Sequence, residues 1–139
     1  MRRSSFTGTR RGMTPAQREA FAGLLARLEI AELTHGDCLG ADAEAHALAR
    51  EAAIPIRIRP CDIVAMRAFC EGGEVVAPAK KPLARNRDIV DDGELLIATP
   101  GMMREQQRSG VWATIRYALR LGRPVYVIWP DGRVEPRQV

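Results

Sequence analysis

The spacing of apolar residues along the chain predicts helices that alternate with short strands. One helix is predicted over residues 15–28, because its apolar residues recur at helical spacing. These residues are Phe21, Leu24, Leu25 and Leu28. Thr14 is the expected N-cap, with Pro15 at the first helical position and Gln17 completing a capping box.

The rest of the chain divides in the same way. Further helices are predicted over residues 41–53, 82–92 and 110–121, and strands over residues 3–6, 31–34, 56–59, 94–100 and 124–130. Residues 61–81 are predicted to be a long loop with a helical turn near Met66, and such a loop inside a small domain is often functional. Residues 131–139 are predicted to be a polar tail.

This alternation predicts one α/β domain over residues 1–139. Because strands alternate with helices and the two later strands are continuous apolar runs, we expect a parallel sheet covered on both faces. The fold class is therefore a Rossmann-like three-layer α/β/α arrangement with a mostly parallel sheet of about five strands. Residues 56–59 alternate isoleucine with arginine, which predicts a strand at the sheet edge with one wet face.

Composition narrows the setting of the protein. The chain has 139 residues, of which 46% are hydrophobic and 27% charged, as in ordinary globular proteins. No run of apolar residues is long enough to cross a membrane, and none follows the first arginines as in a secretory signal. Cys38, Cys61 and Cys70 form no C-x-x-C pair, which favours the reducing cytoplasm. Because no apolar run is long enough to span a membrane, we expect no membrane partner.

The positive charge of the chain comes almost entirely from arginine. The formal net charge is +4, and Lys80 and Lys81 are the only lysines. Arginine forks match phosphate oxygens well. Because the excess is modest, a nucleotide fits it as well as a nucleic acid does.

Glycine-bearing loops follow several predicted strands, at residues 7–12, 35–42, 100–110 and 130–132. In an open parallel sheet such loops lie where ligands bind, and glycine and helix N-termini favour a bound phosphate. Tight turns and helix caps are the simpler interpretation of the same residues. None of the loops matches the standard dinucleotide or ATPase motif. The candidate ligand or phosphate-binding residues are Thr7, Gly8, Thr9, Arg10, Gly36, Asp37, Gly40, Asp42, Arg85, Asn86, Arg108, Ser109 and Gly110.

Four motifs in order resemble one protein family. "TGTRRGMTPAQ", "HGDCLGADAEAH", "LARNRDIV" and "RSGVWATIRYA" together resemble a compact single-domain branch of the SLOG superfamily, which includes DNA-processing protein A (Smf) and the Lonely Guy phosphoribohydrolases. The resemblance implies a Rossmann-like nucleotide-binding domain with "RSGVW" as the phosphate loop. We therefore expect a small-molecule nucleotide ligand, with no required cofactor beyond a bound nucleotide or phosphate.

The chain also departs from the Lonely Guy pattern. Those enzymes carry P-G-G-x-G-T-x-x-E, whereas here Val111 stands at the threonine position and Thr114 at the glutamate position. Threonine cannot stabilise positive charge on a ribose as a carboxylate does. The sequence thus favours binding over catalysis. The alternative is a nucleoside-monophosphate phosphoribohydrolase whose relocated acid is Asp37, Asp42 or Glu105.

Three further expectations concern partners and metals. Binding of single-stranded DNA, as in DNA-processing protein A, is less favoured because few aromatic residues are present for base stacking. Asp42 and His46 share a helix face, near His35, Asp37 and Glu44, but an ion pair explains them as well as a metal does, and we predict no metal site. The alanine-rich helix at residues 41–53 is the expected contact of a homo-oligomer.

Overall fold

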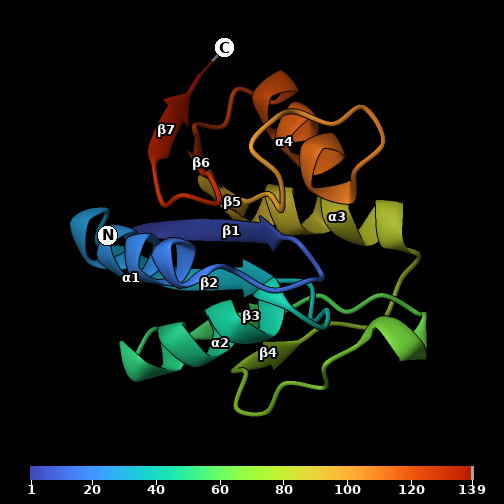
Figure 1. The fold of residues 1–139 in the computed structure, drawn as a ribbon. Helices are drawn as coiled ribbons and strands as arrows, with labels where there is room; N and C mark the ends of the chain where they lie inside the picture. Colours follow the sequence, from blue (N-terminus) through green and yellow to red (C-terminus); the bar gives the residue numbers. More distant parts are fainter. Residues whose placement is uncertain (139) are drawn as a thin grey trace.

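The computed structural model, which describes residues 1–138, places a seven-stranded sheet between two layers of helices (Figure 1). The strands are β1 (Arg2–Gly8), β2 (Ile30–His35), β3 (Ile56–Ile58), β4 (Val75–Val76), β5 (Leu95–Thr99), β6 (Val125–Ile128) and β7 (Val134–Arg137). The helices are α1 (Pro15–Arg27), α2 (Ala41–Glu51), α3 (Pro82–Asp92) and α4 (Gly110–Arg120), with a short 3-10 turn η1 (Val64–Met66). The predicted three-layer α/β fold is confirmed.

The sheet order is β4-β3-β2-β1-β5-β6-β7, and every pairing is parallel except that of β6 with β7. The chain moves outward from β1 through β2 to β4, then returns through α3 to place β5 on the other side of β1. The strand order therefore reverses between β1 and β5. In open α/β sheets a ligand crevice forms at such a reversal, beyond the carboxyl ends of the strands.

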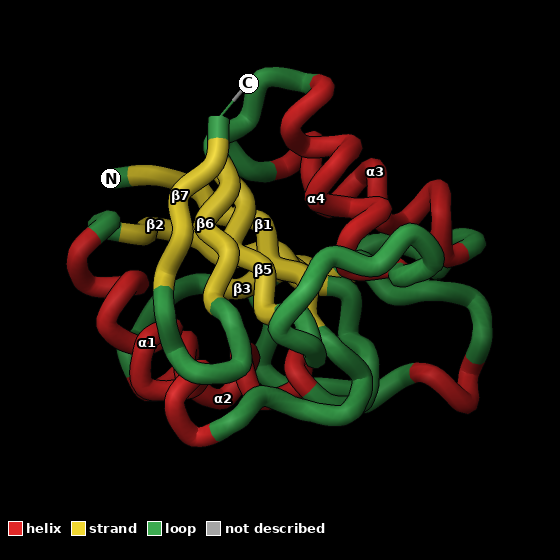
Figure 2. The backbone as a smooth tube through the Cα atoms, turned by 45° about the horizontal axis from the view of Figure 1, so that its top comes forward, coloured by secondary structure: helices red, strands yellow, loops and turns green. Residues whose placement is uncertain are grey.

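Each face of the sheet has its own apolar core. Helices α1 and α2 cover one face and α3 and α4 the other, as Figure 2 shows. The core under α1 and α2 is centred on Phe6 and Phe21, whose rings meet edge to face with centroids 5.1 Å apart. Under α4, Trp112 packs near Trp129 with ring centroids 5.6 Å apart, so the tryptophan at the predicted phosphate loop belongs to the core.

Local chemistry sets the start of two helices, α1 and α4, that follow strands of the sheet. Thr14 and Gln17 form the predicted capping box, and Pro15 occupies the first position of α1. Ser109 caps α4 by accepting a hydrogen bond from the Trp112 N–H at 3.3 Å. Each of these caps fixes where a loop ends and a helix begins at the carboxyl edge of the sheet.

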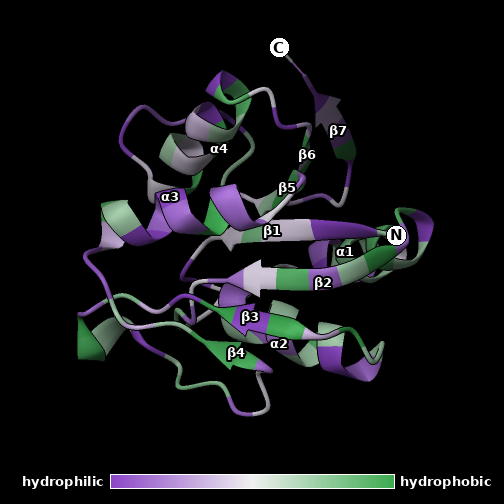
Figure 3. Ribbon diagram, turned by 180° about the vertical axis from the view of Figure 1, so that it is seen from behind, coloured by the Kyte–Doolittle hydropathy of each residue, from purple (hydrophilic) through white to green (hydrophobic). Residues whose placement is uncertain are grey.

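The sheet has seven strands and not about five. Two short strands were missed: β4 within the predicted loop of residues 61–81, and β7 within the predicted polar tail. Because β4 pairs with β3, the prediction that residues 56–59 form an edge strand was wrong. The true edge is β4, which is coloured hydrophobic in Figure 3. Arg57 and Arg59 are held in ion pairs, both of them with Asp92.

Among the residues that the structure describes, no helix is long and apolar enough to cross a lipid bilayer.

Candidate functional site

A cavity of about 380 Å³ opens at the point where the strand order reverses. Its walls come from the loops after β1 and β5, from the first turns of α3 and α4, and from Asp42 in α2. This volume falls within the range of small-molecule sites. The predicted site residues in its lining are Thr7, Gly8, Thr9, Arg10, Asp42, Arg85, Asn86, Ser109 and Gly110.

The loop after β1 is held rigidly at one wall of the cavity. The Thr9 N–H donates to the Thr99 carbonyl at 3.1 Å, and the Thr9 carbonyl accepts from the Gly12 and Ala41 N–H groups at 3.1 and 3.0 Å. Gly40, at φ +91°, lies against the loop: a Cβ there would come within 2.3 Å of the Arg10 carbonyl oxygen. Gly40 thus acts through packing, and it positions the backbone from which Arg10 projects.

The start of α4 forms another wall of the cavity and carries free hydrogen-bond donors. Ser109 uses its hydroxyl for the Trp112 N–H and its carbonyl for the Ala113 N–H. The N–H groups of Gly110 and Val111 have no acceptor among residues 1–138, and both residues line the cavity. Unpaired N–H groups and the positive end of the helix dipole make this position favourable for an anion.

Arg85 places a positive charge at the inner end of the cavity. Its residue is 5% exposed, and within the described chain no carboxylate lies within the 4.0 Å of an ion pair. Three of its N–H groups donate, to the Gly36 carbonyl at 2.6 Å, to Asn86 Oδ1 at 2.9 Å and to Cys38 Sγ at 3.6 Å. A guanidinium carries five such groups, so two remain for a ligand.

Asp42 is the one carboxylate in the cavity lining. Its Oδ2 accepts from the Gly36 and Cys38 N–H groups, each at 3.1 Å, while Oδ1 accepts no hydrogen bond from residues 1–138. Burial raises the pKa of Asp42 to about 6, and the two backbone N–H groups and Arg85 oppose that rise. A carboxylate that is buried, cavity-facing and titrates near neutrality has the features of a functional group.

Other predicted residues lie outside the lining. Gly36 supports Arg85 and Asp42 through its backbone, and Asp37 is 1% exposed with both oxygens occupied, by the Cys70 N–H at 2.8 Å and Arg67 Nε at 3.1 Å. Arg108 precedes the α4 cap but does not reach the cavity. Glu105 is largely exposed and pairs with Arg137 on β7. Thr114, at the position of the Lonely Guy glutamate, turns back to the Gly110 carbonyl and lines a small crevice between α3 and α4.

The structure adds residues that the sequence did not single out. Arg11 lines the cavity beside Arg10, and its sequence position next to a predicted contact was the available signal. The others were not proposed as ligand contacts, although Cys38, Leu83, Ile89 and Val111 lie within the quoted motifs. They are Phe6, Cys38, Met66, Pro82, Leu83, Ile89, Gly101, Met102, Gln106 and Val111.

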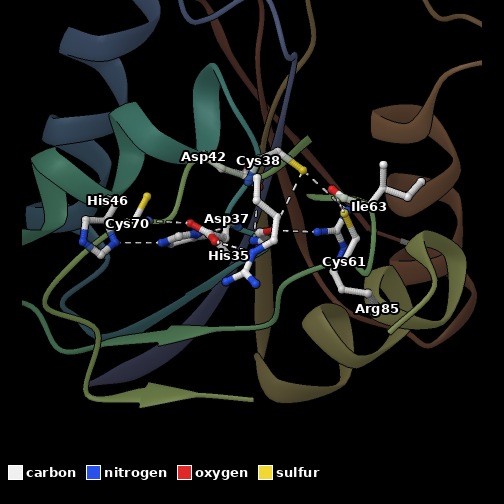
Figure 4. A network of polar contacts seen from close by, with 11 residues as sticks. His35, Asp37, Cys38, Asp42, His46, Cys61, Ile63, Cys70 and Arg85 are labelled. Atoms are coloured by element: carbon white, nitrogen blue, oxygen red, sulfur yellow. Dashed lines mark hydrogen bonds and ion pairs between the residues drawn. The ribbon is translucent and has the colours of Figure 1, made fainter. Parts of the chain in front are cut away.

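A buried histidine pair lies behind the site, and Figure 4 shows it beside Asp37 and Cys70. The Asp37 N–H donates to His35 Nδ1 at 2.9 Å, so Nε2 of neutral His35 carries the proton and donates to His46 Nδ1 at 2.9 Å. His46 Nε2 in turn donates to the Glu71 carbonyl at 2.6 Å. Burial, followed by the neighbouring His46, lowers the pKa of His35 to about 3.

The same hydrogen bonds bear on metal binding. The ligand atoms of His35, His46 and Cys70 all lie within 4.8 Å of one another, which brings together donors typical of zinc. Binding a metal through His35 Nε2 would put the proton on Nδ1, facing the Asp37 N–H that already donates there. The arrangement therefore favours a structural chain of hydrogen bonds over a metal centre. Burial also raises the pKa of Cys70 to about 12, which keeps the thiol protonated.

Solved structures of other proteins share this fold. TM1055, a target of the Northeast Structural Genomics Consortium, matches with a TM-score of 0.64 and 18% identity over 90% of this chain and 72% of its own. The molybdenum cofactor binding protein from the phototrophic bacterium Rippkaea orientalis matches with a TM-score of 0.69 and 18% identity, over 93% of this chain and 78% of its own. No protein-family model and no curated protein sequence matches. The fold and the site define the chain as a Rossmann-like α/β protein with a cavity at its topological switch point.

Proposed function

We propose that this protein belongs to the SLOG superfamily and binds a nucleotide or a related phosphate-bearing ring compound in the cavity between β1 and β5. Ligand phosphate contacts Arg85 and the free N–H groups at the start of α4, and the Asp42 carboxylate accepts a hydrogen bond from a sugar hydroxyl. The observation that carries the proposal is Arg85, because a guanidinium buried without a carboxylate partner is costly unless an anion joins it.

The proposed ligand class includes two kinds of compound. The four sequence motifs support a nucleotide. The similarity in fold to a molybdenum cofactor binding protein adds that cofactor as an alternative phosphate-bearing ligand. One titration panel that contains both kinds of compound distinguishes them.

The test is calorimetric titration with nucleoside monophosphates, the matching nucleosides, inorganic phosphate and molybdenum cofactor. We expect a phosphate-bearing compound to bind and its form without phosphate to bind far more weakly. Arg85→Gln should weaken binding by about 10- to 100-fold, because a hydrogen bond to a charged group contributes roughly 1.5–3 kcal/mol. Arg85→Lys, which keeps the charge but not the fork, should lie between the two.

The matched control is Arg27→Gln, which removes an exposed arginine at the end of α1, far from the cavity in sequence and outside its lining. It should leave the affinity unchanged. Equal affinity in wild type and Arg85→Gln, with both proteins folded by circular dichroism, would defeat the proposal.

A second candidate function is hydrolysis of the N-glycosidic bond of a nucleoside monophosphate. Asp42 supports it, because of the three candidate acids it alone lines the cavity. In this reaction the bond between the sugar carbon C1′ and the base nitrogen breaks, water supplies a hydroxyl to that carbon, and the base takes up a proton. The Asp42 carboxylate would stabilise the positive charge that develops on the sugar.

Release of free base, followed by chromatography, tests this activity. If the protein has this activity, wild type releases base and Asp42→Asn loses at least about 100-fold of the rate, since a neutral amide cannot offset a developing cation. Nucleotide binding by the variant, measured in parallel, distinguishes lost chemistry from lost affinity. Wild type that binds nucleotide but releases no base at high concentration is a binding protein and not a hydrolase.

A further inference from the structure

We infer that the ligand of this cavity carries two linked phosphates, as a nucleoside diphosphate or pyrophosphate ester does, and that Arg10 and Arg11 hold the second one. The inference rests on the proposed function, since it concerns the same cavity. It adds the number of phosphates on the ligand and the residues that bind the second one.

The cavity lining carries more positive than negative side chains. Three arginines, Arg10, Arg11 and Arg85, face the cavity, against the single carboxylate of Asp42. A phosphate monoester brings about 1.5 to 2 negative charges at neutral pH. One such group, placed at Arg85 and the start of α4, leaves the Arg10 and Arg11 wall uncompensated.

Arg10 and Arg11 have no other side-chain partner in the described chain. Within residues 1–138 neither guanidinium donates a hydrogen bond or forms an ion pair, although Arg18, Arg57, Arg59, Arg67 and Arg137 all pair with carboxylates. No acidic side chain of residues 1–138 therefore neutralises these two exposed guanidinium groups, which leaves this wall positive. An electropositive wall facing a cavity favours a multiply charged anion.

The backbone turn that carries Arg10 and Arg11 is fixed in place. The turn carrying Arg10 and Arg11 is closed by the Arg11 N–H to Thr9 Oγ1 at 3.2 Å and by the Gly12 N–H to the Thr9 carbonyl. Gly40 packs against the Arg10 carbonyl, and the Met13 N–H donates to Glu44 Oε1 at 2.5 Å just beyond the turn. A backbone held from both sides reduces the entropy lost when two flexible side chains bind one anion.

The two sets of anion donors come from loops that follow neighbouring strands. Residues 9–11 follow β1, while Ser109 caps α4 after β5, so the two anion-binding walls come from the loops after two adjacent strands. A diphosphate placed across this crevice meets donors from both strands. A monophosphate has one charged group where a diphosphate has two, so we expect it to use the donors of one side.

The test compares a nucleoside monophosphate with the diphosphate of the same base, and inorganic phosphate with pyrophosphate, in metal-free buffer by calorimetry. We expect the diphosphate to bind at least about tenfold more tightly than the monophosphate, the effect of one further charge-assisted contact. In Arg10→Gln/Arg11→Gln this preference should vanish while monophosphate affinity changes little. Pyrophosphate and phosphate should show the same pattern, which would assign the preference to phosphate and not to the base.

The matched control is Arg2→Gln/Arg27→Gln, which removes the same charge from exposed positions outside the lining and should keep the preference. The inference is overturned if monophosphate binds wild type as tightly as diphosphate, or if the Arg10/Arg11 variant keeps the preference; either result leaves the proposed function standing. If none of the four compounds binds, the inference is overturned, and the proposed function is overturned with it unless molybdenum cofactor binds.

Discussion

Replacing Gly8 by alanine should destabilise the protein by about 3 kcal/mol, the upper end of what overpacking a rigid core costs. A Cβ at this position would come within 2.3 Å of Thr99 Oγ1, 2.5 Å of Ala41 Cβ and 3.0 Å of the Phe6 ring. These atoms belong to β5, α2 and β1 itself, and all three residues are buried. Because none of them is the end of a flexible side chain, relief of the clash requires that strands or a helix move apart.

The measurement is the free energy of unfolding from denaturant titration. Gly23→Ala is the matched control, because it adds the same methyl group where no atom lies within 4 Å, on the exposed side of α1. It should stabilise the protein by about 0.5–1 kcal/mol through helix propensity. Equal stability of Gly8→Ala and wild type would show that the strands around the cavity are not packed as described.

Acidification should weaken the fold through His35 unless Asp42 offsets the effect. His35 has a pKa of about 3 in the folded protein against 6.5 for the free side chain, chiefly because it is buried. The folded state therefore binds fewer protons than the unfolded state, and stability is lost as pH falls from 6.5 toward 3. The expected slope is at most about 1.4 kcal/mol per pH unit.

Asp42 acts in the opposite direction. Burial raises the pKa of Asp42 from 3.8 to about 6, so its ionised form costs stability above pH 6 and the cost is relieved as pH falls toward 4. The two effects oppose each other between about pH 6 and pH 4, and wild type should show a shallow profile there. Asp42→Asn removes the offset and should steepen the acid loss. It should also stabilise the protein at pH 8, by up to about 3 kcal/mol.

Unfolding free energies of wild type, Asp42→Asn and His35→Asn/Asp42→Asn at pH 8, 6 and 5 check this balance. The slope is the readout, because His35→Asn also removes the hydrogen bond to His46 and lowers stability at every pH. We expect a steep profile in the single variant and a flat one in the double variant. A steep profile in the double variant would assign the acid sensitivity to other groups.

Much of the architecture follows from local patterns. The capping box at Thr14, the apolar stripe of α1 and the continuous apolar runs of β5 and β6 gave the alternation of helices and strands, and hence the confirmed α/β class. The two missed strands lacked such a pattern. The two residues of β4 show no periodicity, and β7 contains Pro136, which a strand accepts at an edge.

The site divides along the same line. Thr9, Arg10, Ser109 and Gly110 were predicted from loops that follow strands, because the carboxyl ends of parallel strands meet at one edge. The sequence could not separate Asp42 from Asp37, five residues earlier. The left-handed backbone of Asp37, at φ +58°, turns its carboxylate toward Arg67 and Cys70, while the first turn of α2 directs Asp42 to the cavity.

The sequence by itself determined the four helices, the strands other than β4 and β7, and the mostly parallel sheet that the helices cover. Only the tertiary structure decided that Arg85 lies buried without a carboxylate, that Asp42 faces the cavity and that Gly8 and Gly40 serve close packing. The physical reason is range. Periodicity and capping act over a few residues, whereas burial, pKa and ion pairing depend on groups far apart in the sequence. The Arg85 side chain and the Gly36 carbonyl, for example, are 49 positions apart.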